Sequence, residues 1–143
     1  MTLAAVHSGG LAPALTSLRL SLHVLAAAVF VGGQLTMAGL LGVLRPLGRD
    51  ATRAAARAFA RVQWPAYALL LLTGIWNGFA TDPGSRPHSW QVVFGVKVAV
   101  ALLAGAAAYA HSRSRSTLGL ALFGALSALG ALGAMVLGVL LAG

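Results

Sequence analysis

Four long runs of apolar residues alternate with short polar segments along the chain. The runs cover residues 17–44, 64–80, 90–110 and 117–142. A helix needs about 20 mostly apolar residues to cross the hydrocarbon core of a bilayer, and each run is near that length. The pattern predicts an all-α protein in which residues 1–143 form a single transmembrane domain, an integral membrane four-helix bundle.

The composition identifies lipid as the main solvent of this chain. Apolar residues make up 59% of the 143 residues and charged residues 8%, whereas a soluble domain carries about 25% charged residues. The lipid bilayer is therefore the first expected partner. The chain has no cysteine, which excludes disulfides, zinc–thiolate sites, iron–sulfur clusters and covalently attached haem.

The distribution of arginine predicts the topology. Lys and Arg number ten against two Asp and Glu. The first connection holds five arginines and the third holds two, whereas the second holds only Arg86 beside Asp82. Cytoplasmic loops are enriched in basic residues, so connections one and three are expected in the cytoplasm and both termini outside. A nucleic-acid partner is not favoured, because no aromatic residues are interleaved with these arginines.

The first connection is itself expected to be helical. Asp50 is a suitable N-cap residue, and the alanine-rich segment that follows favours a helix. Arg53, Arg57 and Arg61 recur every four residues and so share one face. We expect a cytoplasmic helical extension that enters the second span and bends near Pro65. The arginine stripe suits anionic lipid.

Several polar residues lie inside the spans, where ionisable groups are expensive and usually functional. At about 1.5 Å per residue, His23 lies about 9 Å and Lys97 about 10 Å from the outer surface. Asn77 lies at about 5 Å and Met135 at about 10 Å by the same estimate. These four residues therefore share one layer of the outer leaflet. The other charged or amide side chains of the spans are Arg19, Gln34 and Gln91.

His23 admits three interpretations: a hydrogen-bonding packing residue, a metal or haem ligand, or a proton relay. Imidazole binds iron, zinc and copper, and a large apolar macrocycle suits the space between helices. Arg19 lies one turn from His23 and is placed to meet a haem propionate. Lys97 lies on an inward face of its helix, or else snorkels from a lipid-facing one. His111 lies about 20 Å away across the bilayer, while His7 and His88 are on the outer side.

Small residues mark where the helices approach one another. Gly130, Ala134 and Gly138 recur every four residues in the fourth run. Such faces let backbones approach closely in lipid. They predict a compact bundle, and one such face also suits a homodimer.

Four segments together resemble one superfamily of bacterial membrane proteins. They are LHVLAAAVFVGGQL at 22–35, RAFARV at 57–62, LLLLTGIWNG at 69–78 and VVFGVKVAVALLAGAAAYAH at 92–111, with the arginines before the second helix. The superfamily contains the membrane domain of copper-resistance protein D and the four-helix membrane protoporphyrinogen oxidase. Its shared positions correspond here to His23, Gly32 with Gly33, Arg57 or Arg61, Thr73 with Gly74, and Lys97.

The resemblance implies a multi-pass protein of the bacterial cytoplasmic (inner) membrane and two chemistries. The oxidase-like members imply non-covalent haem b on His23, and the copper members imply copper handling across the membrane. Copper(I) prefers Cys and Met ligands, and this chain has no Cys and only Met1, Met37 and Met135. Haem is therefore the favoured cofactor and copper the alternative.

The resulting hypothesis is a haem-b membrane protein of redox or diatomic-gas (O₂ or NO) chemistry, an oxidase or an NO-detoxifying oxygenase. His23 is the expected iron ligand and Arg19 the propionate partner, with Phe30 at the cofactor. Lys97, Asn77, Trp76 and Met135 are candidates for the distal side, the first three for catalysis. The alternatives are a copper-handling permease or accessory protein and a structural subunit without a cofactor.

The topology is testable without any cofactor. A reporter that is active only outside the cytoplasm should be active when fused to either terminus, and a reporter that is active only in the cytoplasm should be active when inserted within residues 45–61. The reason is that connections one and three contain seven arginines, whereas connection two contains one. Cytoplasmic activity of a terminal fusion would contradict the predicted orientation.

Overall fold

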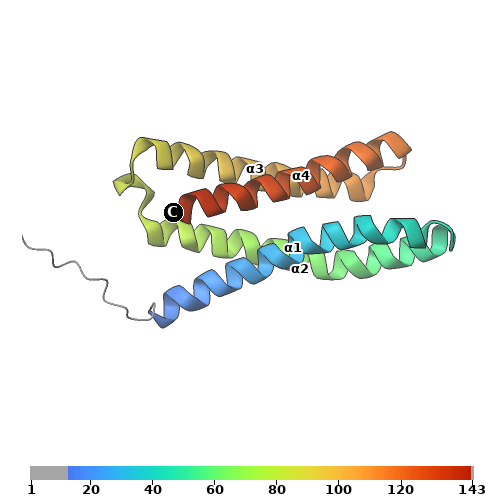
Figure 1. Ribbon diagram of the computed structural model, residues 1–143, viewed down its shortest axis with the longest axis horizontal. Helices are drawn as coiled ribbons and strands as arrows, with labels where there is room; N and C mark the ends of the chain where they lie inside the picture. The colour runs from blue at the N-terminus through green and yellow to red at the C-terminus, as the bar shows by residue number, and fades with distance from the viewer. Residues whose placement is uncertain (1–12, 143) are drawn as a thin grey trace, which may run out of the picture.

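The computed structural model describes residues 13–142 and consists of helices along almost all of this range (Figure 1). The four α-helices are α1 (Ala14–Leu44), α2 (Arg49–Thr81), α3 (His88–Arg113) and α4 (Thr117–Ala142). A short 3₁₀ helix, η1 (Pro83–Ser85), joins α2 to α3. No strand occurs within residues 13–142. The predicted all-α class is confirmed.

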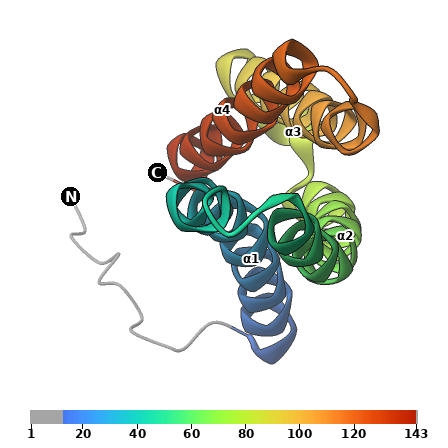
Figure 2. The same ribbon diagram turned by 90° about the vertical axis from the view of Figure 1, so that its right-hand side faces the viewer.

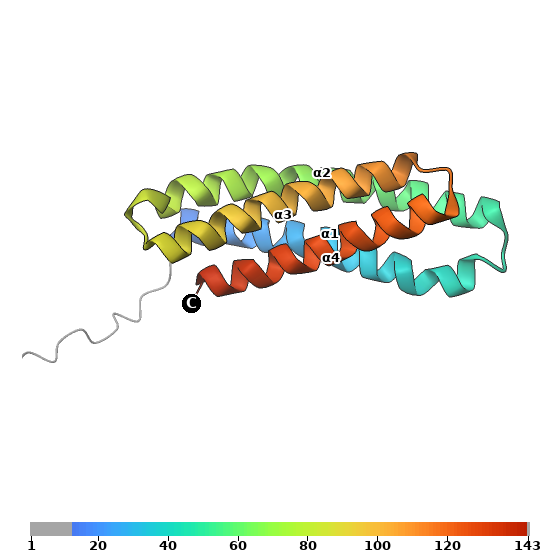
Figure 3. The ribbon, with the colours of Figure 1, turned by 90° about the horizontal axis from the view of Figure 1, so that it is seen from above.

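The four helices form two antiparallel hairpins. Helix α1 packs along α2 and α3 packs along α4, while α1 and α4 make a lighter contact between the hairpins. Figure 2 shows the two pairs end-on, and Figure 3 shows the four helices running side by side. The start of α1, the end of α2, the start of α3 and the end of α4 therefore share one end of the molecule.

The arginine-rich connection is largely helical, as predicted, but its start differs from the expectation. Helix α2 begins at Arg49, and Gly48 at φ 101° is its N-cap residue, without a side-chain cap. The expected N-cap role of Asp50 is therefore wrong. Gly48 occupies a left-handed conformation that suits glycine, and the turn thereby ends one residue before Asp50. The helix continues through Pro65 into the second apolar run.

Three helices are long and apolar enough to cross a membrane: α1, α3 and α4. Helix α2, which contains the expected second span, does not meet this criterion. Its apolar half is interrupted by polar or interfacial residues such as Gln63, Pro65, Tyr67 and Asn77. These polar residues thus distinguish α2 from the other three helices.

Burial in the bundle is inverted relative to a soluble protein. Leu, Val and Phe side chains cover the outside, and Phe79 is 83% exposed. The buried set includes four polar residues: Arg19, Gln63, Thr73 and Ser127. Water would not tolerate so large an apolar surface on a monomer, whereas lipid does, so this distribution supports a membrane location.

The core lies where the two hairpins meet. Phe30, Val31, Ala104 and Ala131 are buried together, with Tyr67, Leu70 and Leu132 packed around them. The rings of Phe30 and Tyr67 have centroids 4.9 Å apart. The Tyr67 hydroxyl donates to the Ala101 carbonyl at 3.1 Å, which links α2 directly to α3.

Small residues make the close approaches, as the sequence predicts. A Cβ on Gly130 would lie 3.1 Å from the Ala104 Cβ, so α3 and α4 approach closely there. A Cβ on Gly105 would overlap the Tyr67 ring at its hydroxyl end. Gly105 therefore provides the space for the tyrosine that joins the hairpins.

Substitution of this glycine should loosen the bundle. Gly105→Ala should lower the free energy of unfolding by about 1–3 kcal/mol, the usual range for overpacking. The added Cβ would displace the Tyr67 ring, and the displaced ring would lose its hydrogen bond to the Ala101 carbonyl. Gly95→Ala is the matched control on the same helix, since nothing lies within 4 Å of its added Cβ. Thermal unfolding in detergent measures both, and equal melting temperatures would contradict the role of Gly105.

Candidate functional site

His23 is oriented by a hydrogen bond across the α1–α2 hairpin. Its Nδ1 lies 2.9 Å from the Thr73 hydroxyl oxygen. The Thr73 hydroxyl donates its own proton to the Leu69 carbonyl at 2.7 Å. Since a hydroxyl has a single proton, the His23 Nδ1–H donates and the Thr73 oxygen accepts. This assignment leaves Nε2 of the neutral imidazole with a free lone pair.

A glycine lies beside the imidazole. A Cβ on Gly74 would lie 3.5 Å from the His23 Cε1 atom, which is ordinary contact. Thr73 thus supplies the hydrogen-bond acceptor, and Gly74 borders the ring without being required for its fit. Thr73 itself is only 3% exposed, so this anchor is fixed by packing.

Lys97 occupies the same level of the bundle as His23. It is half-buried, and its Nζ would lie 3.1 Å from a Cβ on Gly138 of α4. The Gly78–Phe94 and Tyr67–Ala101 contacts set the antiparallel register of α2 and α3, which places Lys97 opposite Thr73 and Gly74. Gly138 therefore gives the Lys97 side chain room between α3 and α4.

Arg19 and Asn77 lie one helical turn beyond His23 and Thr73, toward the end of the bundle where α1 begins and α2 ends. Arg19 is 7% exposed. Its Nη1 and the Asn77 Oδ1 are both buried without a hydrogen-bond partner. The register that pairs His23 with Thr73 places Arg19 at the level of Asn77. We name Arg19, His23, Thr73, Asn77 and Lys97 the polar cluster.

The polar cluster carries positive charge without a carboxylate to balance it. The chain contains two acidic residues. Asp50 lies in the first turn of α2 at the opposite end, and Asp82 lies exposed beyond the end of α2. Within residues 13–142, neither Arg19 nor Lys97 forms an ion pair. A buried cation is costly when it is unpaired, so the cluster favours an anionic ligand.

Other expected site residues lie outside this cluster. Trp76 is 41% and Met135 45% exposed, and both belong to the outer surface of the bundle. Phe30 is a core residue against Tyr67. Gln34 accepts a hydrogen bond from Ser127 at 3.1 Å and thereby links α1 to α4.

The remaining histidines are distant or exposed. His111 lies at the opposite end of α3, with its Nδ1 2.8 Å from the Leu120 carbonyl. His88 is the exposed first residue of α3. His7 lies outside the described residues. Among residues 13–142, no group of three or more His, Cys, Asp or Glu side chains is placed to hold a metal ion.

The partner of His23 was the main residue that sequence reasoning missed. Thr73 entered the sequence analysis only through the resemblance, although it is an isolated hydroxyl in a leucine-rich run. That isolation is a usable signal, since a buried hydroxyl needs a partner. Its pairing with His23 could not be derived, because the two are 50 residues apart.

Two open hollows on the described part of the chain lie away from the polar cluster. One of about 280 Å³ lies at the α1–α2 turn. The other, of about 470 Å³, is lined by residues of α1 from Leu20 to Ala28. Its lining residues are centred on the face of α1 opposite His23. Neither hollow has His23 or Lys97 among its lining residues.

No family model, curated protein or solved structure matches this chain. The polar cluster is therefore the feature of the molecule that bears on function. It offers one oriented neutral nitrogen donor, His23, and two unpaired cations, Arg19 on α1 and Lys97 on α3. Such a set can bind a metal-containing anion or transfer protons.

The orientation of His23 is testable by ¹⁵N NMR of histidine-labelled protein in detergent. His23 should be the Nδ1-protonated tautomer, and Thr73→Val should let the Nε2-protonated form appear, because the acceptor is lost. Thr73→Ser should preserve the wild-type spectrum. His111 has its own carbonyl partner and serves as an internal reference. An unchanged His23 signal in Thr73→Val would contradict the assignment.

Proposed function

We propose that the chain is a haem-b-binding integral membrane protein that performs redox or diatomic-gas (O₂ or NO) chemistry. The observation that carries the proposal is the His23 imidazole, whose Nδ1–H is held by Thr73 beside the unpaired cations Arg19 and Lys97. Histidines that bind metals usually donate the other ring N–H to a fixed acceptor. The resemblance to the copper-resistance protein D superfamily supports the same proposal.

The donor set fits haem b in chemistry and in charge. The free Nε2 of His23 is a suitable axial ligand for haem iron. The two propionates of haem b are carboxylates, and Arg19 and Lys97 supply two cations. Arg19 has a buried Nη1 with no partner, which a carboxylate oxygen would satisfy by a charge-assisted hydrogen bond.

Haem would supply an iron centre for electron transfer or for binding a small gas. The residues of the chain would control access to that centre. Lys97 and the Asn77 amide can donate hydrogen bonds within the cluster, and the apolar helices around them exclude water. Lys97 has two available roles, as a propionate partner or as a hydrogen-bond donor to the substrate.

Binding of the macrocycle requires space between the hairpins. The α1–α2 and α3–α4 pairs are closely packed, while contacts between the pairs are fewer. The polar cluster draws residues from both pairs: His23 and Thr73 from the first, Lys97 from the second. Separation of the pairs at this end would admit a flat ligand without breaking either hairpin.

The membrane arrangement of the proposal has α2 as the fourth spanning helix. Helix α2 packs against the candidate span α1, and the His23–Thr73 hydrogen bond puts its apolar half at the same depth. With the arginine-rich turn in the cytoplasm, the polar cluster lies in the outer leaflet of the bacterial inner membrane. A homodimer belongs to the same proposal, through an apolar outer face of the bundle.

Replacement of the proposed ligand gives the direct test. Purified wild-type protein should show a Soret band, and His23→Ala should lose at least about 90% of bound haem because the axial bond is removed. His111→Ala is the matched control and should keep wild-type haem content, since His111 lies at the opposite end of α3. Haem is measured by the pyridine haemochrome assay, normalised to folded protein from gel filtration.

Other outcomes distinguish the alternatives. Equal haem content in His23→Ala and wild type would refute His23 as the ligand. Bound copper in place of a Soret band, measured by metal analysis, would support the copper-handling alternative. Neither haem nor copper in protein purified from cells supplied with both would refute both cofactor proposals.

A further inference from the structure

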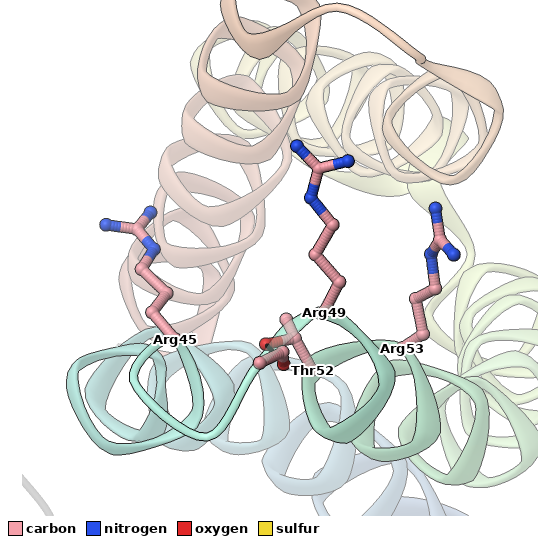
Figure 4. Close-up of a pocket in the computed structure, with 5 residues that line it drawn as sticks. Arg45, Arg49, Thr52 and Arg53 are labelled. Atoms are coloured by element: carbon pink, nitrogen blue, oxygen red, sulfur yellow. Dashed lines mark hydrogen bonds between the residues drawn. The ribbon is translucent and has the colours of Figure 1, made fainter.

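Three arginines surround one hollow at the end of the bundle opposite the polar cluster. The hollow has a volume of about 280 Å³ and is lined by Arg45, Gly48, Arg49, Thr52 and Arg53. Figure 4 shows the three guanidinium groups extending from the α1–α2 turn toward the same side. Within residues 13–142, none of these guanidinium groups has an ion-pair or hydrogen-bond partner.

The tight turn is what brings these arginines together. Arg45 follows the last residue of α1, while Arg49 and Arg53 are one turn apart at the start of α2. Gly48 at φ 101° allows the chain to reverse between them. The Thr52 hydroxyl lies 3.3 Å from the Leu44 carbonyl and 3.2 Å from the Gly48 carbonyl, so it braces the turn. The arginines are thus fixed at their backbones and free at their charged ends.

The three guanidinium groups carry the same charge around one hollow, and like charges repel unless an anion lies between them. Guanidinium groups bind phosphate oxygens in paired, planar hydrogen bonds. The nearest acidic residue in sequence, Asp50, is exposed and forms no ion pair in the described part of the chain. The chemistry of the hollow therefore matches a phosphate group from outside the protein.

We propose that Arg45, Arg49 and Arg53 form a binding site for the phosphate of an anionic phospholipid headgroup. Helix α1 is a candidate membrane span, so the turn at its end lies at headgroup level. Val43 is 63% and Leu47 68% exposed beside the turn. These apolar side chains offer contacts to acyl chains, which a soluble phosphate lacks.

The site is independent of the proposed haem function. His23 and Arg45 are 22 residues apart on one helical path, or about 33 Å. A change at the turn should therefore leave haem content unaltered. Failure of either proposal can be recognised without reference to the other.

The test compares two triple variants with equal loss of charge. Arg45→Gln with Arg49→Gln and Arg53→Gln removes the site. Arg86→Gln with Arg113→Gln and Arg115→Gln removes three exposed arginines that do not line the hollow. Native mass spectrometry of the full chain in detergent measures bound phosphatidylglycerol against phosphatidylcholine at equal concentrations.

Wild type should retain one phosphatidylglycerol with a preference of about tenfold or more over phosphatidylcholine, since several basic residues act together. The site variant should lose this preference, and the control variant should keep it within about twofold. Equal losses in both variants would overturn the proposal in favour of diffuse surface charge. Displacement of the lipid by millimolar inorganic phosphate would overturn the lipid as the source of the phosphate group.

Discussion

The contact between Tyr67 and the Gly105 backbone holds the two hairpins in register. Each hairpin is stabilised by its own long antiparallel contact, but the hairpins meet at few points. At this junction the Tyr67 ring packs on Phe30 and its hydroxyl bonds to Ala101. The level of α3 against α2, and hence the level of Lys97 against His23, depends on this contact. The proposed site therefore depends on Tyr67, which lies six residues before Thr73 on α2.

In addition to this contact, side-chain hydrogen bonds join three other pairs of helices. His23 joins α1 to α2, Ser127 joins α4 to α1, and Trp90 donates from α3 to the Leu141 carbonyl of α4 at 3.3 Å. In lipid there is no hydrophobic drive between helices, so small residues and such bonds determine how they associate. The bundle largely follows this rule: apart from Phe30 and Val31, its buried residues are small or polar, and many large apolar residues face outward.

Both ends of the bundle hold basic residues without acidic partners, but the two ends differ in how deeply these residues are buried. At one end Arg19 and Lys97 are buried or half-buried, so an unpaired charge there is costly. At the other end Arg45, Arg49 and Arg53 are exposed and reach outward, where the proposed lipid phosphates would meet them. The first arrangement favours a specific ligand, and the second favours the membrane surface. Both proposals follow from cations that the chain itself does not neutralise.

The sequence by itself determined the helices. The last apolar run, 117–142, coincides with α4, and the helical extension before the second run is present, because apolar runs and alanine-rich segments act locally. Gly48 was not foreseen as the start of α2, since helix ends depend on turn geometry. Depth counting also placed His23, Asn77 and Lys97 at one end of the molecule, because rise per residue is constant.

Only the tertiary structure decided which of those residues meet. Thr73 became the partner of His23, while Trp76 and Met135, at similar depths, face outward. Helix rotation and pairing separate these cases, and both depend on contacts between residues far apart in sequence. Arg45 was joined to Arg49 and Arg53 by the turn, whereas the sequence pattern had grouped Arg53 with Arg57 and Arg61. Sequence periodicity predicts which residues are neighbours on one helix, whereas a site shared between helices depends on how those helices pack together.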